Sequence, residues 1–138
     1  MSTIQKIRYS DCDPQGIVFN GNYARYWDDA MTDWFDELED DGISLSELGI
    51  DVVTARLEID FKSSATLRDI LETRVTAEKL GNTSMTLQIE TSKKPDDTVV
   101  ALGKIVCVFV DRGHLRPVPV PDAFRAAVTE FEVTPRRA

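Results

Sequence analysis

The chain has 138 residues, 42% of them hydrophobic, which is the size and composition of one globular domain, and we expect a single domain over residues 1–138. Its net charge of −8 argues against a nucleic-acid partner, which needs a basic face, and against docking on an anionic membrane. No run approaches the roughly 18 apolar residues that span a bilayer, and the N-terminus has no apolar signal segment, so we expect a cytoplasmic protein. The two cysteines lack zinc spacing, and nothing in the sequence calls for a metal or a cofactor.

The first predicted element is a short strand over residues 3–9, and a turn-rich stretch over residues 10–16 follows it. Pro14 biases Asp13 towards an extended backbone, and Gly16 permits a left-handed turn. These residues predict a tight loop around Asp13.

Apolar residues at helical spacing predict a long amphipathic helix over about residues 22–39. Its apolar face consists of Tyr23, Tyr26, Trp27, Ala30, Met31, Trp34, Phe35 and Leu38. Asn20 or Asn22 can cap its N-terminus, and Gly42 can end it. A face that carries both tryptophans must pack against a large apolar surface, and a sheet provides one.

From residue 52 onward the apolar period changes to two, which predicts strands over residues 53–61, 70–80, 85–89 and 99–110. The first is predicted to bury one face, made of Val53, Ala55, Leu57, Ile59 and Phe61. The last is nearly all apolar and is predicted to be buried on both faces. Turns are expected at residues 81–82, 93–97 and 112–114, and a short helix at residues 122–128. Hairpin-sized connections imply an antiparallel sheet, so the predicted class is α+β.

The stretch at residues 9–23, Tyr-Ser-Asp-Cys-Asp-Pro-Gln-Gly-Ile-Val-Phe-Asn-Gly-Asn-Tyr, resembles the signature of the 4-hydroxybenzoyl-CoA thioesterase family. That family has the hotdog fold, in which a curled antiparallel sheet of about five strands wraps one long central helix. The resemblance implies hydrolysis of an acyl-CoA thioester to free acid and CoA. It also implies a homodimer or homotetramer with its active site at the subunit interface.

Carried over residue by residue, the resemblance makes Asp13 the catalytic carboxylate, as nucleophile or general base. Backbone N–H groups around Asn20, at the helix start, would polarise the thioester carbonyl. Asn20 holds a place where related enzymes carry His or Tyr, and Tyr23 is included in the site because it can line an acyl tunnel. The cations assigned to the CoA phosphates are Arg116, Lys79 and Lys62.

The residues alone leave alternatives open. Asp13 before Pro14 also fits a simple Asx turn. Asp11 is predicted to be structural, although an Asp11/Asp13 metal pair is conceivable. Cys12 is a nucleophile only if a histidine lies beside it, and the single histidine, His114, is about a hundred residues away.

Two other functions compete with hydrolysis. Hotdog hydratases typically use an Asp and His pair, and this chain has no histidine near the motif. The second alternative is a non-catalytic module that binds acyl-CoA or another ligand, and release of free CoA separates it from an enzyme.

Overall fold

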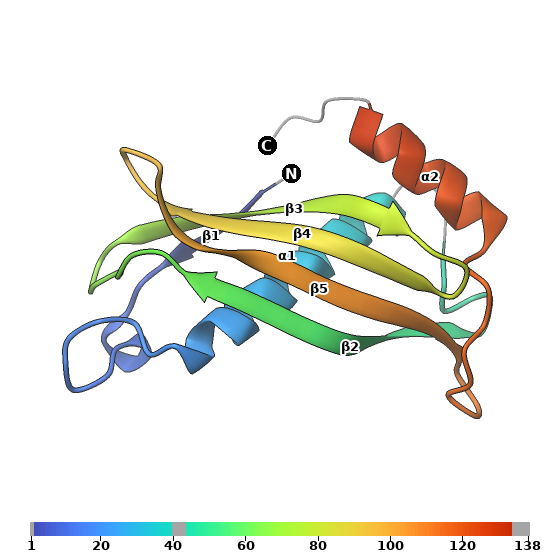
Figure 1. Cartoon of the computed structure of the whole chain (residues 1–138), viewed down its shortest axis with the longest axis horizontal. Helices are drawn as coiled ribbons and strands as arrows, with labels where there is room; N and C mark the ends of the chain where they lie inside the picture. The colour runs from blue at the N-terminus through green and yellow to red at the C-terminus, as the bar shows by residue number, and fades with distance from the viewer. Residues whose placement is uncertain (1, 40–43, 134–138) are drawn as a thin grey trace.

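The structure, a computed structural model, describes residues 2–39 and 44–133 (Figure 1). One five-stranded sheet contains β1 (Ser2–Lys6), β2 (Ile50–Phe61), β3 (Ile70–Leu80), β4 (Ser84–Lys93) and β5 (Thr98–Asp111). The helices are α1 (Gly21–Glu39) and α2 (Asp122–Val133), and a 3-10 turn spans Tyr9–Asp11. All strand pairs are antiparallel, which confirms the predicted α+β class.

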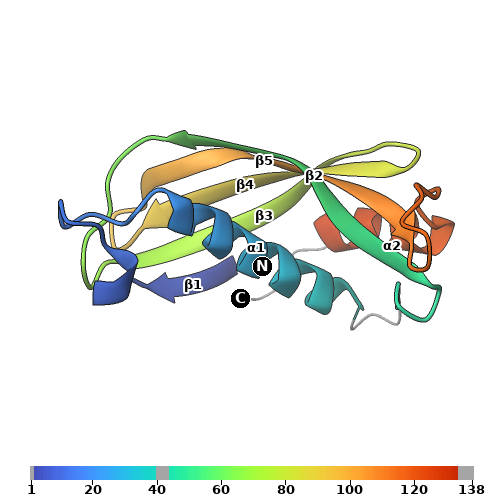
Figure 2. The same ribbon diagram turned by 90° about the horizontal axis from the view of Figure 1, so that it is seen from below.

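The strand order is β1-β3-β4-β5-β2, so β1 and β2 lie at opposite edges of the sheet although they are consecutive strands in the sequence. Between them α1 carries the chain across the concave face, where it contacts β3 and β1 (Figure 2). Most of β2 is therefore left uncovered: its middle residues are exposed, although Phe61 at its end contacts Tyr23 of α1.

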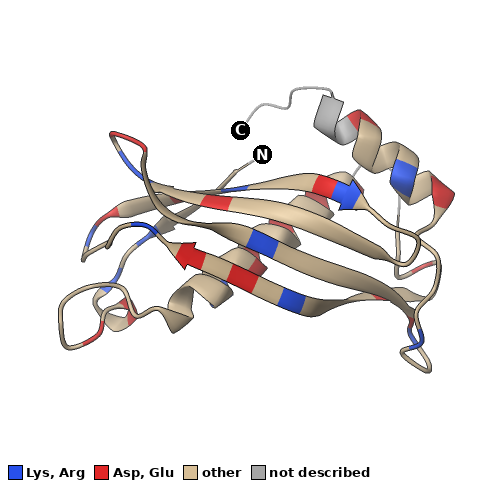
Figure 3. Ribbon diagram, in the orientation of Figure 1, with Lys and Arg blue, Asp and Glu red and all other residues tan. Residues whose placement is uncertain are grey.

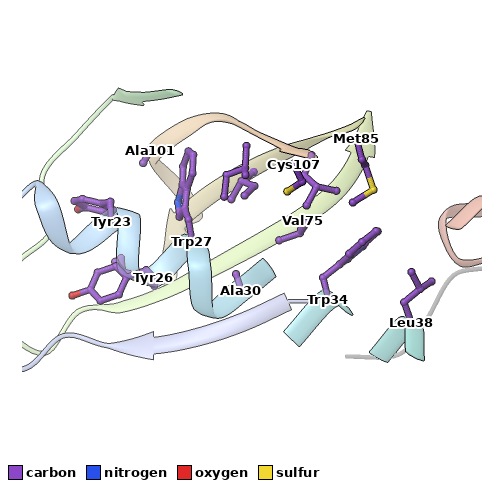
Figure 4. Close-up of a cluster of buried hydrophobic side chains, with 14 of the residues drawn as sticks. Tyr23, Tyr26, Trp27, Ala30, Trp34, Leu38, Val75, Met85, Ala101 and Cys107 are labelled. Carbon is purple, nitrogen blue, oxygen red and sulfur yellow. The ribbon is translucent and has the colours of Figure 1, made fainter. Parts of the chain in front are cut away.

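The apolar face of α1 forms the centre of the core (Figure 4). Six of its eight predicted residues are buried, namely Tyr23, Tyr26, Trp27, Ala30, Trp34 and Leu38, while Met31 and Phe35 are half-buried. The predicted helix is confirmed and begins one residue earlier, at Gly21. Gly42, its predicted end, lies outside the described residues.

A small polar network is buried within this apolar core. The Trp27 indole N–H donates to the Thr91 hydroxyl at 2.9 Å, and the Thr91 and Thr73 hydroxyls lie 2.8 Å apart. All three side chains are buried, so each polar atom depends on the others for its hydrogen bond.

The predicted alternation of β2 is wrong at one residue. Val53 pairs with Val108 and Leu57 pairs with Ile105, but between Thr54 and Arg56 the register shifts, so Ala55 is an extra residue. Such a bulge reverses the faces of the residues beyond it. Leu57, like Ile59 and Phe61, therefore faces the concave side, whereas Val53 faces the outer side.

The prediction that β5 is buried on both faces is also wrong. Ala101, Ile105, Cys107 and Phe109 are buried on the concave side, but Lys104 on the outer side is exposed. Charged residues of both signs are spread along the strands of the sheet (Figure 3). They form ion pairs such as Lys104–Glu78 and Arg56–Glu58, both at 3.2 Å. Neither α1 nor α2, the helices of the described residues, covers this face, and Lys104 there is exposed to water.

The ends of two elements differ from prediction for local reasons. β1 stops at Lys6, which pairs with Ile70, because Ile70 is the first residue of the neighbouring strand β3. α2 continues to Val133 instead of ending at residue 128, since no proline or glycine interrupts it before Pro135.

Candidate active site

The predicted loop around Asp13 is a tight hairpin. Cys12 and Val18 form an antiparallel bridge, and the Asp13 N–H donates to the Ile17 carbonyl at 2.8 Å. The Gly16 N–H donates back to the Asp13 carbonyl at 2.9 Å, and Gly16 has φ +83°, a conformation that favours glycine. The sequence thus fixes the backbone on both sides of the candidate carboxylate.

The Asp13 carboxylate is half-buried and uses one of its two oxygens within the loop. Its Oδ1 accepts the Gln15 N–H at 2.8 Å, which is the Asx turn expected before Pro14. Within the described part of the chain, Oδ2 has no hydrogen-bond partner. Asp13 borders an open hollow of about 430 Å³, together with Tyr9, Cys12, Pro14, Gly16 and Leu67. One carboxylate oxygen is thus available to a substrate or a water molecule.

The N-terminus of α1 follows this loop and carries two unpaired backbone amides. Within the described residues, the N–H groups of Asn20 and Gly21 have no acceptor. The N–H groups on either side of these two all donate to backbone carbonyls. The donors are the N–H groups of Val18, Phe19, Asn22 and Tyr23. Unpaired amides at a helix N-terminus carry partial positive charge and can bind an anionic oxygen.

A second hollow, of about 270 Å³, lies at this helix start and brings together three predicted site residues: Asn20, Tyr23 and Lys62. Ile17, Val18, Phe61, Ser63 and Ser64 complete its lining. Lys62 directly follows β2, and its N–H donates to the Val100 carbonyl at 2.8 Å. Asp13 and Asn20 thus line two different hollows at the same end of the sheet, where β2 ends beside the start of α1 (Figure 1).

Tyr23 separates this second hollow from the core. Its ring makes edge-on contacts with Tyr26 and Phe61, at centroid distances of 5.7 and 5.5 Å. Burial, and then the charge of Asp69, raise the pKa of Tyr23 to about 12. The hydroxyl therefore keeps its proton near neutral pH and can donate a hydrogen bond, but it cannot act as a base.

Asp11 anchors the loop to α1. Its carboxylate accepts from Arg25 Nη2 at 2.8 Å and from the Arg8 N–H at 2.8 Å. Its backbone carbonyl accepts from the Phe19 N–H at 2.9 Å and from Asn22 Nδ2 at 2.7 Å. The predicted structural role of Asp11 is confirmed. Neither expected helix cap is formed among the described hydrogen bonds: the Asn20 side chain accepts none from the helix, and the Asn22 side chain donates to the Asp11 carbonyl.

Arg25 is not on the apolar face that helical spacing predicts for α1, and sequence reasoning missed its role as the partner of Asp11. The two residues are 14 positions apart in the sequence. No local pattern links a loop aspartate to an arginine at that separation, so only the folded chain shows the pair.

The other two predicted CoA contacts lie elsewhere in the chain. The Arg116 carbonyl accepts from the Asp111 N–H, whereas Lys62 is bonded to Val100. These anchor points are eleven positions apart on β5, or about 36 Å at the rise of a strand. Lys79 is exposed on the outer side of the sheet, beside Glu78 and Arg56. Arg116 thus lies at the opposite end of the sheet from Lys62.

Neither cysteine has a histidine beside it. Cys12 is in the loop at one end of the sheet, and His114 is in the turn after β5 at the other end, with its side chain 77% exposed. Burial, with a smaller contribution from the Asp28 charge, raises the pKa of the Cys107 thiol to about 12. A Cys12–His114 catalytic pair is therefore ruled out within one chain.

Residues 2–39 and 44–133 contain no group of three or more His, Cys, Asp or Glu side chains arranged to hold a metal ion. The Asp11 carboxylate is already engaged by Arg25 and Arg8. Of the helices in the described ranges, none is long and apolar enough to cross a membrane, and a cytoplasmic location stays a prediction.

Comparison with known proteins decides the family. The model of the thioesterase-like superfamily matches residues 7–128. The chain belongs to this superfamily. The resemblance of residues 9–23 to the 4-hydroxybenzoyl-CoA thioesterases is thereby confirmed, and with it the hotdog fold and the assignment as a thioester hydrolase.

Individual relatives are similar to this chain over most of its length. The acyl-CoA thioesterase YbgC of Helicobacter pylori is 26% identical over 127 residues, covering 87% of this chain and 93% of that protein. A thioesterase of Thermus thermophilus, solved with coenzyme A and zinc, superposes with TM-score 0.82 at 27% identity, covering 97% of this chain and 95% of that one. A 4-hydroxybenzoyl-CoA thioesterase mutant with bound 4-hydroxybenzoyl-CoA superposes with TM-score 0.83 at 23% identity, covering 93% of this chain and 97% of that one.

Proposed function

We propose that this thioester hydrolase acts on acyl-CoA, releasing a free acid and CoA, with Asp13 as its catalytic carboxylate. The observation that carries the proposal is the pair of unpaired N–H groups of Asn20 and Gly21, at the start of a long helix and just beyond the Asp13 loop. The relatives named for acyl-CoA substrates, and those solved with CoA, support this substrate class.

The two amides supply electrostatic catalysis. When the thioester carbonyl is attacked, its oxygen gains negative charge, and preorganised donors stabilise that charge more than they stabilise the neutral carbonyl. Backbone N–H groups do not depend on the side chain at Asn20, so the absence of His or Tyr there leaves this function intact. The leaving thiolate is stable enough that a strong general acid is not required.

The free oxygen of Asp13 performs the attack in one of two ways. As a nucleophile it bonds to the carbonyl carbon, the C–S bond breaks, CoA leaves as the thiolate, and water hydrolyses the resulting anhydride. As a general base it takes a proton from the water that attacks. A single turnover in ¹⁸O-water tests the first: label incorporated into the Asp13 carboxylate identifies a nucleophile, because only an anhydride opened at the aspartyl carbon transfers the water oxygen to Asp13.

We further propose that a second copy of the chain completes the CoA site. Lys62 lies beside the helix start, but Arg116 is about 36 Å away along β5 and cannot reach the same hollow. The edge strand β2 leaves Leu57 42% and Phe61 48% exposed. Antiparallel pairing of two β2 edges about a twofold axis would bring Arg116 of the partner subunit towards Lys62 of the first. The functional unit is then a homodimer, or a tetramer built from two such dimers.

A panel of aromatic, short-chain and long-chain acyl-CoA thioesters tests the activity. Steady release of free CoA from at least one of them is expected. Tight binding of acyl-CoA without any release would contradict hydrolysis and favour the binding module considered from the sequence.

Arg116→Ala tests the CoA contact. The variant should raise KM for acyl-CoA more than KM for the corresponding pantetheine thioester, because only CoA carries the nucleotide phosphates. Lys79→Ala, on the outer side of the sheet, is the matched comparison. An equal effect of Arg116→Ala on both substrates removes Arg116 from the CoA site.

Mixing two variants tests the shared site. In a mixture of Asp13→Asn and Arg116→Ala chains, each mixed dimer would contain one site with both native residues, so turnover at low acyl-CoA concentration should rise after subunit exchange. If Asp13 and Arg116 serve a site within one chain, mixing restores nothing. A protein that stays monomeric by light scattering would also contradict the proposal.

A further inference from the structure

Asp11 is the only acidic side chain of the described residues that is buried, with 4% of its surface exposed. A buried carboxylate is unfavourable unless charges and hydrogen bonds compensate it. Arg25 provides the charge at 2.8 Å, and the Arg8 N–H provides a further hydrogen bond at 2.8 Å. The Asp11 end of the pair is therefore held within the fold, while the Arg25 side chain reaches it from the surface.

The bonds of Asp11 join the two parts of the proposed site. Asp13 follows two residues after Asp11 in the same loop. Asn20 directly follows Phe19, whose N–H donates to the Asp11 carbonyl at 2.9 Å. Asn22 and Arg25, on the first two turns of α1, bind Asp11 through its carbonyl and its carboxylate respectively. One residue thus holds the loop with the carboxylate against the helix start with the amides.

Arg25 contributes little to the core itself. Its side chain is 55% exposed, and its guanidinium lies 5.1 Å from the centroid of the Tyr26 ring, on the outside of α1. Replacing it leaves the buried aromatic packing in place but removes the ion-pair partner of the Asp11 carboxylate, which then keeps only the hydrogen bond from the Arg8 N–H among the described bonds of that carboxylate. Arg25 is therefore a residue whose loss shifts the loop more than it unfolds the protein.

We propose that Arg25, acting through Asp11, is a positioning residue for hydrolysis, which sets the Asp13 carboxylate relative to the N–H groups of Asn20 and Gly21. The proposal rests on the proposed function of that site. Misplacement of a catalytic group by about 1 Å is enough to lower a rate on the order of 100-fold.

Arg25→Gln should lower kcat by about 10- to 100-fold and leave KM for acyl-CoA near the wild-type value. Arg25→Lys, which keeps the charge, should recover part of kcat. Arg74→Gln is the control, because Arg74 makes a 3.0 Å ion pair with the mostly buried Glu72 on β3, neither residue lines the two hollows of the site, and Glu72 keeps its 3.0 Å pair with Lys94. That variant should keep the wild-type kcat. Wild-type kcat in Arg25→Gln, measured alongside an inactive Asp13→Asn, would overturn the positioning role alone.

Amide hydrogen exchange tests the same proposal without any turnover, so its failure and the failure of the proposed function can be told apart. The N–H groups of Phe19 and Asp13 are hydrogen-bonded within the anchored loop. Their protection should fall at least about 10-fold in Arg25→Gln and stay unchanged in Arg74→Gln. Unchanged protection of both amides in Arg25→Gln would overturn the proposal even in a protein that hydrolyses nothing.

Discussion

The two halves of the concave face of the sheet differ in what covers them. Over β3 and β4, residues such as Leu71, Leu87 and Ile89 are fully buried beneath α1. At the β2 edge, Leu57 faces the same side, yet it is 42% exposed. The covered half is complete within one chain, whereas the open half presents an apolar surface that one chain does not bury. Stability should therefore come mainly from the covered half, and association from the open half.

The first prediction contrasts one leucine from each half. Leu87→Ala should lower the free energy of unfolding by about 3 kcal/mol, because it leaves a cavity in the covered half. Leu57→Ala should lower it by less than about 1 kcal/mol in a dilute sample but should weaken association. Denaturant titration measures the first quantity and sedimentation the second. If the two variants lost equal stability and Leu57→Ala associated as the wild type does, the two halves of the face would not differ in their contributions to stability and association.

The second prediction concerns the backbone contact that holds the open half to the sheet. A Cβ added at Gly103 in β5 would lie 1.9 Å from the Glu58 carbonyl oxygen of β2, so the strands would have to separate there. We expect Gly103→Ala to lower the free energy of unfolding by about 3 kcal/mol. Gly113→Ala is the control, because a Cβ there meets no atom within 4 Å. A fully stable Gly103→Ala protein would show that β2 can move away without loss.

The third prediction lies within the covered half. Thr91→Val keeps the side-chain shape but removes the hydroxyl that accepts from Trp27 and pairs with Thr73. The buried indole N–H then lacks a partner, and the free energy of unfolding should fall by about 1 to 3 kcal/mol. Thr76→Val, at an exposed position on β3, should change little. If both variants unfold at the wild-type midpoint, the network does not contribute to stability.

The fourth prediction, with the smallest effect, concerns Tyr23 at the boundary of the two halves. The folded pKa of Tyr23 is about 12, against 10.0 for an unburied tyrosine. Between pH 10 and 12 the unfolded chain loses this proton while the folded chain keeps it, so stability is intact below pH 10 and falls as pH rises to 12. The melting temperature of Tyr23→Phe should therefore fall less between pH 10 and 12 than the melting temperature of the wild-type protein. Tyr9, which is 85% exposed, is the control: the same reduction in Tyr9→Phe would show that Tyr23 is not the cause.

The sequence predicts the element positions well: the helix at residues 22–39, which has a clear apolar period, and the strand at residues 70–80, whose pattern is mixed, both match the structure within one residue. It does not predict the bulge at Ala55, since a residue that interrupts the pairing looks like any other in an alternating run. Nor does it show that the β2 face stays open, because Leu57 and Leu87 have the same local pattern. Burial depends on the strand order, which periodicity does not contain.

Part of the candidate site could likewise be predicted from the sequence, and part could not. Asp13, Asn20 and the helix start follow from the motif, since they are close in sequence. The Asp11–Arg25 pair and the separation of Arg116 from Lys62 depend on the folded chain, and no local pattern contains them. The single-domain organisation and the catalytic and CoA-binding roles of these residues remain predictions.

Release of CoA by Asp13→Asn is the most direct test of the account. On a thioester that the wild-type protein hydrolyses, kcat should fall by roughly 100- to 10,000-fold while the circular dichroism spectrum and melting temperature stay unchanged. Because asparagine keeps the Asx-turn acceptor used by Gln15, the loop itself should be preserved. A folded Asp13→Asn protein with wild-type kcat would contradict the account and leave Asp13 as a turn residue only.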